Sequence, residues 1–429
     1  MIAISLELAL LALTVLCLLL FFGGVQIFLV FGLWALGFYT MVPEFPASNM
    51  SILAFSELES FTYVAIPLFV LVGDLINRAR ISDEIIEFSR ACIGWLPGST
   101  GNTSIGCSAI FSAITGSNAA TTASVGKALH PPMDDEGYDE SYAAATIASG
   151  GIVGTVLPPS VLLIVYGVMY GVSVPDLFIA GIVPGIAILF GLVAVNTTLS
   201  WRNDYGQDSS AFEFQPWEIV QTAWQAKVGL GTIVILLGGI YIGIFTPSEA
   251  AAVAVFYILL MSVALGKITR LEQVVSASFT SLLLIGVILP IVVAAVAIQQ
   301  NLSFLGIQEA VSEALLSLGS PWLVMLAMML IMLATGSVLA SVPNIALTVP
   351  LLTPAAMELG LDPVTWAIIF IISDAIGFIT PPYGLNLYII SGITDIDYLR
   401  VTYDALPYLG MLIAVWALFF AVPELNVLA

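Results

Sequence analysis

Two segments of one pattern offer the first candidate chemistry. Residues 154–159 read Gly-Thr-Val-Leu-Pro-Pro, and residues 377–382 read Gly-Phe-Ile-Thr-Pro-Pro. A proline pair removes two backbone donors and clashes with the preceding turn, so a helix must break at each segment. In a bilayer, freed carbonyl groups are tolerated only where they are buried in protein or line a cavity. Two matching broken helices in the two halves of a membrane protein indicate a transporter's binding site.

Small hydroxyl, amide and glycine residues gather in two further apolar stretches, residues 96–131 and 320–354. These residues are Ser112, Thr115, Gly116, Ser117, Asn118, Thr121 and Thr122 in the first stretch, and Thr335, Gly336, Ser337, Ser341 and Asn344 in the second. Such residues allow helices to pack closely. Opposite a broken helix, however, unwound carbonyls and hydroxyls suit a hard cation such as sodium, and a half-helix N-terminus suits a carboxylate. Because intramembrane charges are few, main-chain oxygens must do most of the ion binding.

Asp374, three residues before Gly377, is the one acid expected deep in an apolar helix. An intramembrane carboxylate is a functional hypothesis by default. The sequence leaves open a sodium ligand, a proton site or a partner for a hidden donor. We count seven residues as candidates for substrate binding or coupling: Ser117, Asn118, Ser337, Ser341, Asn344, Asp374 and Asn386.

Two other acids are expected to be structural. Asp74 and Arg78 lie one helical turn apart and predict an ion pair. Thr246, Pro247 and Glu249 follow the order of an N-cap, a first-turn proline and a capping-box glutamate, so Glu249 is expected to cap a helix rather than bind an ion.

Composition limits the class of protein. Of 429 residues, 60% are hydrophobic and 9% charged, and the mean hydropathy is +1.08, which predicts an all-α polytopic membrane protein. One histidine and three cysteines in apolar surroundings predict neither a metal centre nor a disulfide framework. We find no metalloprotease, hydrolase-elbow or phosphate-loop motif, so we expect no enzyme, no ATP coupling and no cofactor beyond coupling sodium ions.

The net charge of −20 makes nucleic acid an implausible partner. Two explanations of the acidic bias stay open. The acids are either ordinary solvated loop residues, or they reflect a salty environment that screens self-repulsion.

Membrane-length apolar segments predict the crossings. They are residues 3–22, 25–42, 62–78, 142–174, 176–198, 226–245, 248–266, 276–299, 363–393 and 403–425. Residues 96–131 and 320–354 are interpreted as two re-entrant hairpins because each arm is short for a full span. The alternative is two tightly joined crossings in each stretch.

The positive-inside rule favours the hairpins. With the N-terminus outside, the basic residues fall at cytoplasmic ends, and the outer loops at 43–61 and 300–319 hold neither lysine nor arginine. Residues 81–88 and 307–316 alternate charged and apolar positions at helical spacing, which is typical of interfacial helices lying flat on the bilayer.

The chain repeats itself beyond the proline pairs. One constant shift aligns Gly137 with Gly360, Asp139 with Asp362, and Pro184 with Pro407. Each half reads as hairpin, loop, broken helix and closing helix. An odd number of crossings separates equivalent helices, so the two halves form an inverted repeat, as in secondary transporters.

At these residues the chain resembles the large membrane subunit of tripartite ATP-independent periplasmic (TRAP) transporters, the DctM family, over nearly its whole length. The motifs that carry the resemblance are Trp-Leu-Pro-Gly at 95–98, Phe-Ser-Ala-Ile-Thr-Gly-Ser at 111–117, residues 154–159, Gly-Ile-Phe-Thr-Pro-Ser-Glu-Ala at 243–250, and residues 377–387.

The resemblance implies an elevator mechanism, in which a transport domain slides against a scaffold. We expect residues 94–198 and 319–429 to form the two transport halves, and residues 1–93 and 199–318 to supply the scaffold and arms. The resemblance also implies three partners besides the lipid bilayer. They are a small four-helix membrane subunit, a periplasmic binding protein, and the small organic acid that the binding protein delivers. The expected location is the cytoplasmic (inner) membrane of a bacterium or archaeon.

The resemblance further implies two sodium sites. The first uses carbonyls near Ser112, Thr115, Gly154, Leu157 and Pro159, and the second matches Gly336, Gly377, Thr380 and Tyr383. The chain departs from the family at two positions. Many members carry an aspartate where this chain has Ala340, and many carry an apolar residue where it has Asp374.

Two other functions remain to be weighed. One is a stand-alone sodium-coupled dicarboxylate carrier with a related inverted repeat and no binding protein. The other is a non-transporting membrane scaffold, which leaves the duplicated broken helices unexplained.

Overall fold

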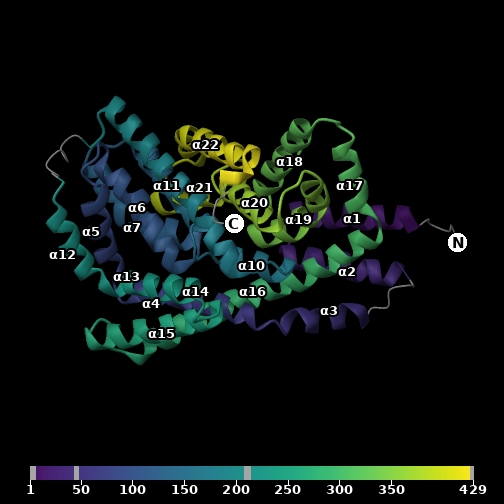
Figure 1. Cartoon of the computed structure of the whole chain (residues 1–429), viewed down its shortest axis with the longest axis horizontal. Helices are drawn as coiled ribbons and strands as arrows, with labels where there is room; N and C mark the ends of the chain where they lie inside the picture. The colour runs from purple at the N-terminus through teal and green to yellow at the C-terminus, as the bar shows by residue number, and fades with distance from the viewer. Residues whose placement is uncertain (1–5, 43–47, 207–213, 426–429) are drawn as a thin grey trace.

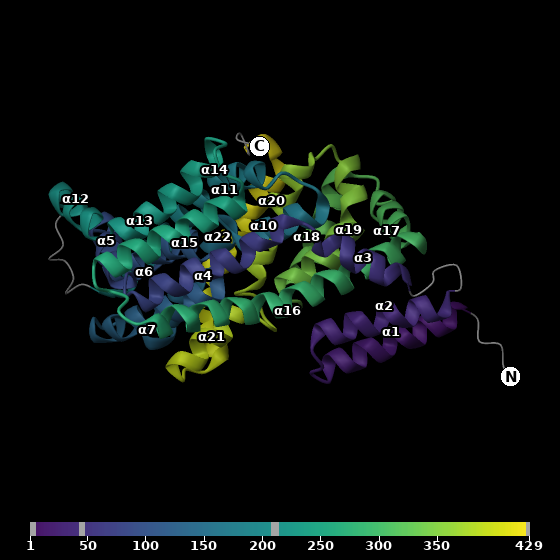
Figure 2. The same ribbon diagram turned by 90° about the horizontal axis from the view of Figure 1, so that it is seen from below.

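The computed structural model describes residues 6–42, 48–206 and 214–425 of the chain. Within these ranges every regular element is a helix, which confirms the predicted all-α class. The helices form an elongated body, and the purple pair α1–α2 lies at its edge (Figures 1 and 2).

The first predicted hairpin and broken helix are present. They comprise α6 (Ser99–Thr115), α7 (Asn118–Asp135), α8 (Glu140–Gly151), α9 (Val153–Val156), α10 (Val161–Tyr170) and α11 (Val174–Asn203). Only two residues join α6 to α7, and Gly116 turns the chain there at a φ of 60°, a left-handed conformation that favours glycine. The break between α9 and α10 falls at the proline pair, as predicted.

The second half repeats this order of elements. It comprises α18 (Pro321–Gly336), α19 (Ser341–Glu358), α20 (Pro363–Gly377), α21 (Leu385–Thr394), α22 (Tyr398–Ala421) and the short η4 (Pro423–Leu425). Equivalent residues also share local geometry. Gly137 and Gly360 have φ values of 79° and 84°, and Asp139 and Asp362 each cap the helix that follows. The inversion of the two halves across a membrane stays a prediction.

One prediction concerns the cap at Asp362. Its Oδ1 accepts hydrogen bonds from the backbone N–H of Val364 at 3.0 Å and of Thr365 at 2.9 Å. Burial acts to raise the pKa of Asp362, but hydrogen bonds from Thr365 and Val364 outweigh it and lower the pKa. Asp362→Ala should therefore destabilise the fold by about 1 kcal/mol at neutral pH, measured by thermal unfolding in detergent.

The pH dependence of that difference checks its cause. Because the folded-state pKa of Asp362 is lowered, its contribution is present above the unfolded-state pKa and is lost as pH falls through the folded-state value. The difference in stability between the wild type and Asp362→Ala, measured by thermal unfolding, should become smaller as the pH is lowered. A gap that is the same at all pH values would contradict capping by the ionised carboxylate.

The remaining helices surround these halves. They are α1 (Leu6–Phe22), α2 (Ile27–Met41), α3 (Ser48–Leu58), η1 (Phe61–Val64), α4 (Ala65–Arg78), α5 (Ser82–Ile93), α12 (Pro216–Gln225), α13 (Lys227–Ile233), the π-helical η3 (Val234–Gly238), α14 (Gly239–Tyr241), α15 (Pro247–Ala264), α16 (Leu271–Phe304) and α17 (Ile307–Leu316). Helices α5 and α17 confirm the helical pattern predicted for residues 81–88 and 307–316. Helix α16 runs along most of the molecule (Figure 2).

Helices α3 and α12 were not predicted. Helix α3 occupies part of residues 43–61, which were expected to be an outer loop, and packs against α16; residues 43–47 lie outside the described ranges. At 11 and 10 residues, α3 and α12 are too short to be recognised as spans.

Six of the described helices are long and apolar enough to cross a membrane, or seven if α12 and the helix from Lys227 to Tyr241, which meet at 83°, are counted as one span. The bend falls where the predicted span 226–245 begins. Helices α1 and α2 have only 17 and 15 residues, and predicted span 363–393 is two shorter helices. Residues 3–5 of the first predicted span lie outside the described part.

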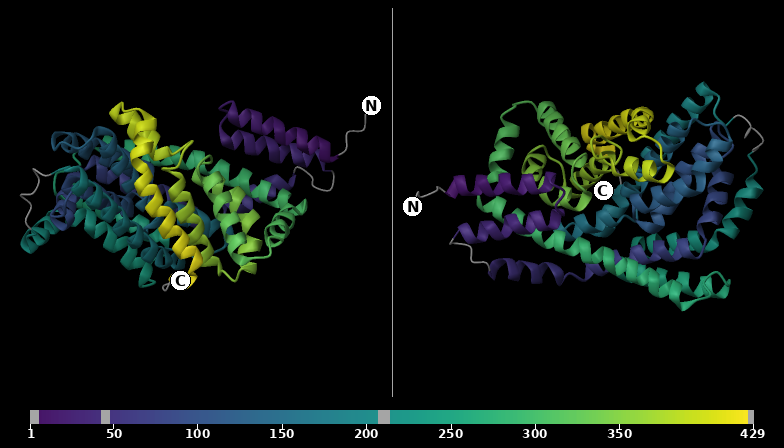
Figure 3. Two further views of the ribbon diagram at one scale, coloured as in Figure 1. Left: turned by 90° about the horizontal axis from the view of Figure 1, so that it is seen from above. Right: turned by 180° about the vertical axis from the view of Figure 1, so that it is seen from behind.

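Buried hydrogen bonds hold the two halves together. The hydroxyls of Thr146 on α8 and Tyr408 on α22 lie 2.8 Å apart, and Tyr408 donates to Tyr142 at 3.1 Å. Tyr142 in turn donates to Asn196 Oδ1 on α11 at 2.8 Å, while Asn196 Nδ2 donates to the carbonyl of Gly98 at 3.1 Å. One network thus links the entrance of the first hairpin to both closing helices. The crossing of α22 over the front of the body is seen in Figure 3.

Candidate functional site: two hairpin tips against two broken helices

The first hairpin meets the first broken helix at a glycine. A Cβ atom on Gly154 would overlap the Cβ of Ser112 and lie 2.7 Å from its Oγ, so only glycine allows α9 to approach α6 this closely. The hairpin turn lies beside the unwound segment, because a Cβ on Gly116 would be 3.7 Å from the carbonyl oxygen of Pro159. Ser112, Gly154 and Pro159, predicted together, thus lie around one junction.

Other predicted residues surround the same junction. Thr115 Oγ1 lies 3.2 Å from Thr121 Oγ1, and Asn118 Nδ2 donates to Thr155 Oγ1 at 3.4 Å. Ser117 caps α7 by accepting from the backbone N–H of Ala120. Leu157 ends α9 in an extended conformation with a ψ of 123°. The backbone between α9 and α10 is therefore unwound at the proline pair, where free carbonyl groups were expected.

The second hairpin meets its broken helix backbone to backbone. A Cβ on Gly377 would overlap the carbonyl oxygen of Gly336 and lie 2.5 Å from its carbonyl carbon. Tyr383 N–H donates to the carbonyl of Ser337 at 3.1 Å, which ties the unwound segment to the hairpin tip. Thr380 Oγ1 donates to the carbonyl of Ile376 at 2.7 Å, so its hydroxyl is used within its own chain segment. Gly336, Gly377 and Tyr383 are brought together as predicted.

Asp374 lies beside this second junction and is only 2% exposed. Asn344 Nδ2 donates to its Oδ1 at 2.9 Å, and the Oδ1 of Asn344 accepts from Thr348 at 2.8 Å. The other carboxylate oxygen, Oδ2, has no hydrogen-bond partner among the described residues. Ser341 faces the same carboxylate without completing a hydrogen bond to it. A buried carboxylate with one free oxygen can hold a cation or a proton, and is costly if it holds neither.

The N-terminus of α19 opens toward this carboxylate. Its N-cap residue, Ala340, forms no side-chain cap, whereas Ser117 caps the equivalent α7. An uncapped helix N-terminus presents backbone N–H groups and the positive end of the helix dipole. The region around Asp374 therefore combines one negative side chain with one positive helix end.

Asn386 bridges the two halves. Its Nδ2 donates to the carbonyl of Ala148 on α8 at 3.0 Å, although the two residues are 238 positions apart. The side chain is fully buried and its Oδ1 has no partner among the described residues. Asn386 lies against Gly151 beside Thr122, rather than next to Asp374. It was predicted as a substrate or coupling candidate, and the structure gives it a bridging position.

Sequence reasoning missed Thr155 and Ser373. Thr155 partners Asn118, and its carbonyl accepts from Ser160 at 2.8 Å. Ser373 is buried, and its Oγ has no partner in the described part of the chain. Both are hydroxyl residues inside the broken helices, and their nearness to Gly154 and Asp374 in sequence was the available signal.

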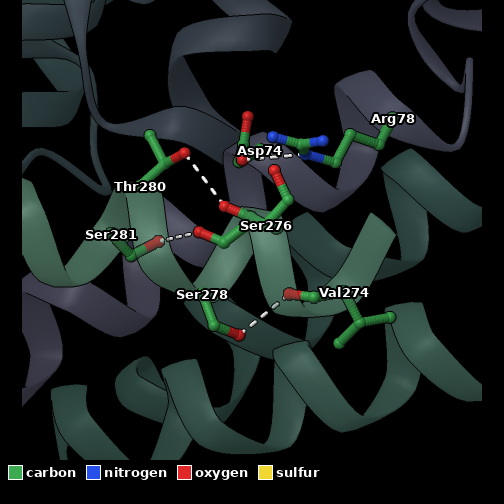
Figure 4. Close-up of polar contacts among 8 residues, drawn as sticks. Asp74, Arg78, Val274, Ser276, Ser278, Thr280 and Ser281 are labelled. Carbon is green, nitrogen blue, oxygen red and sulfur yellow. Dashed lines mark hydrogen bonds and ion pairs between the residues drawn. The ribbon is translucent and has the colours of Figure 1, made fainter. Parts of the chain in front are cut away.

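The two acids expected to be structural are confirmed in that role. Arg78 Nε donates to Asp74 at 3.0 Å, and the pair lies beside α16 (Figure 4). The hydroxyls of α16 drawn there, on Ser278, Thr280 and Ser281, donate to carbonyls one turn earlier in their own helix. Glu249 forms the expected capping box with Thr246.

Comparison with known proteins agrees with this architecture. Residues 13–425 match the family described as the DctM component of tripartite ATP-independent periplasmic transporters. The chain is 31% identical over 420 residues to the C4-dicarboxylate TRAP transporter large permease protein DctM of Rhodobacter capsulatus, covering 94% of both chains. It is 32% identical over 382 residues to the sialic acid TRAP transporter large permease protein SiaM of Vibrio cholerae, covering 86% of each.

Two further similarities add detail. The isethionate TRAP transporter permease protein DctMQ of Oleidesulfovibrio alaskensis is 31% identical over 412 residues, which cover 94% of this chain and 63% of that protein. Among solved structures, the YdaH transporter of Alcanivorax borkumensis shares the fold with a TM-score of 0.58 at 14% identity, over 86% of each chain. The paired hairpins and broken helices described above are thus those of a transporter permease, and the chain belongs to the DctM family of TRAP transporter large permeases.

Proposed function

We propose that this chain is the large permease subunit of a sodium-coupled, binding-protein-dependent importer of a small organic acid. The observation that carries the proposal is the pair of junctions at Gly154 and Gly377, where each hairpin packs against a broken helix just before its unwound segment. Carbonyl oxygens freed from a helix are suitable ligands for sodium, and helix N-termini beside them suit a carboxylate. Two sodium sites are assigned, one near Ser112, Thr115 and residues 154–159, the other near Gly336, Gly377, Thr380 and Tyr383.

The substrate class rests on relatives and on the uncapped α19. The related permeases are named for C4-dicarboxylate, isethionate and sialic acid, all of which are acids. An anion at the N-terminus of α19 would gain from the helix dipole and from N–H donors that Ala340 leaves uncapped. We assign the acid group of the substrate to this end of the second hairpin, near Ser337 and Ser341.

Transport is assigned to an elevator motion. Residues 94–198 and 319–429 would move as one body, which is supported by the hydrogen bonds from Thr146 to Tyr408 and from Asn386 to Ala148. Residues 1–93 and 199–318 would form the scaffold and arms. Such a division lets one rigid unit carry both sodium sites across the bilayer.

The membrane setting is part of the proposal. We place the chain in the cytoplasmic membrane of a bacterium or archaeon with its N-terminus outside. Lys267, which follows α15, forms an ion pair with Glu84 on α5, so basic and acidic residues from two helices meet there. The positive-inside rule assigns the basic helix ends, including Lys267, to the cytoplasm.

Two protein partners complete the system. A small membrane subunit is supported by the DctMQ relative, of whose length this chain spans less than two thirds. A periplasmic binding protein is supported by the family described as periplasmic transporters. The alternative function, a stand-alone carrier, needs neither partner.

Uptake by reconstituted vesicles tests the proposal. Proteoliposomes would hold the chain with its small subunit, and labelled C4-dicarboxylate, isethionate or sialic acid would be supplied with and without the binding protein. We expect uptake only with an inward sodium gradient and with the binding protein present. Equal uptake without the binding protein would favour the stand-alone carrier, and equal uptake in potassium would refute sodium coupling.

A further inference from the structure

An apolar pocket lies between the N-terminal helices and the tip of the second hairpin. It has a volume of about 570 Å³ and opens between the α1–α2 pair, α16 and the second hairpin. Trp34 and Phe31 line it on α2, Leu302 on α16, and Val338 and Leu339 at the hairpin tip. This volume is within the range of roughly 300–1,000 Å³ typical of small-molecule sites.

The polar atoms at this pocket are already paired within the protein. Thr14 donates to the carbonyl of Leu10 at 2.9 Å and accepts from Trp34 Nε1 at 3.0 Å. Thr335 Oγ1 donates to the carbonyl of Met332 at 3.3 Å, and Cys17 Sγ contacts the carbonyl of Val30 at 3.7 Å. No charged residue lines the pocket among those described. A polar substrate or an ion would thus lose hydration and find few partners here.

The pocket is continuous with the apolar outer surface of the same helices. Leu18, Phe22 and Leu33 are exposed on α1 and α2, and Leu18 and Phe22 also line the pocket. In a membrane, this surface contacts lipid tails, which are as apolar as leucine. A single flexible hydrocarbon chain matches this apolar, uncharged lining, whose polar groups are already paired within the protein.

We propose that this pocket binds one acyl chain of a membrane lipid, placed between the N-terminal helix pair and the second hairpin. The chain would contact Val338 and Leu339, which follow Gly336 and Ser337 directly in the hairpin tip. Bilayer lipid would thereby support the hairpin tip. The site does not depend on sodium coupling or on the nature of the substrate.

Photolabelling tests this site. The purified complex would be placed in vesicles of phosphatidylethanolamine and phosphatidylglycerol that carry a phosphatidylethanolamine with a photoreactive acyl chain, and labelled residues would be mapped by mass spectrometry. We expect labels on Phe31, Trp34 or Leu302. Leu302→Trp, which fills the pocket from α16, should reduce labelling of Phe31 and Trp34 at least fivefold.

A matched variant controls for general lipid contact. Leu283 lies on the same helix, is 58% exposed and does not line the pocket, so Leu283→Trp should leave pocket labelling unchanged. Pocket residues labelled no more than exposed residues of α16 would overturn the proposal. Absence of pocket labels in the complex, when the large permease reconstituted without the small subunit is labelled there, would also overturn it and assign the surface to that partner. Neither result bears on sodium-dependent uptake, which is measured separately.

Discussion

Asp374→Asn should lower initial uptake at least tenfold and weaken its dependence on sodium. The substitution keeps the size of the side chain and leaves an oxygen for the hydrogen bond from Asn344, which is 2.9 Å long in the structure. It removes the charge from a site that is 2% exposed and whose Oδ2 has no partner among the described residues. Interactions with a charged group contribute about 1.5–3 kcal/mol, which corresponds to a loss of roughly 10- to 100-fold.

The measurement is the initial uptake rate against sodium concentration in proteoliposomes. Glu358→Gln is the matched control, because it also removes one negative charge from the second hairpin but lies at the exposed end of α19. It should transport like the wild type. If Asp374→Asn keeps the wild-type sodium dependence, Asp374 has no part in coupling.

A compensating change sharpens this test. Ala340 precedes Ser341, which faces Asp374, and Asn344, which bonds it, follows one turn later on the same face of α19. Ala340→Asp in the Asp374→Asn background should therefore restore part of the uptake, because it returns a negative charge to the same neighbourhood. No recovery would indicate that the position of the charge, as well as its presence, matters.

Repeated local signals made much of this architecture predictable. The proline pairs at residues 158–159 and 381–382 predicted both helix breaks, because each proline removes a backbone donor and clashes with the preceding turn. One constant shift along the chain aligns Asp139 with Asp362, and this alignment predicted two equivalent helix starts. The structure shows the same cap at each of them. These features are encoded within a few residues of each other, so sequence alone reveals them.

Features that depend on distant contacts could not be predicted in this way. The bond from Asn386 to Ala148 joins residues 238 positions apart, and nothing near Asn386 in sequence identifies its partner. Likewise, Asp374 was recognised as an unusual acid, but its pairing with Asn344 depends on how α19 packs against α20. The short helices α3 and α12 were not predicted because each packs against a neighbouring helix and neither is an apolar segment long enough to cross a membrane.

Gly377→Ala should reduce uptake roughly 100-fold while the protein still folds. The new Cβ would overlap the carbonyl oxygen of Gly336 and lie 2.5 Å from its carbonyl carbon. Both atoms are backbone, so the strain cannot be relieved by a side-chain rotation, and the hairpin tip must move away from the broken helix. Such overpacking costs about 1–3 kcal/mol of stability. A displacement of about 1 Å at a binding site can cost a factor of about 10² in rate, whereas a protein with about 5–15 kcal/mol of stability stays folded after such a loss.

Gly392→Ala separates this effect from a general cost of removing glycine. Gly392 lies in α21, the second part of the same broken helix, and a Cβ there would meet no atom within 4 Å. Alanine is also the better helix former, so this variant should be as stable as the wild type and transport normally. Uptake and thermal unfolding would be measured for both variants. If Gly377→Ala transports at the wild-type rate, the close approach of Gly336 to Gly377 is not required for transport, and the second sodium site cannot depend on that geometry.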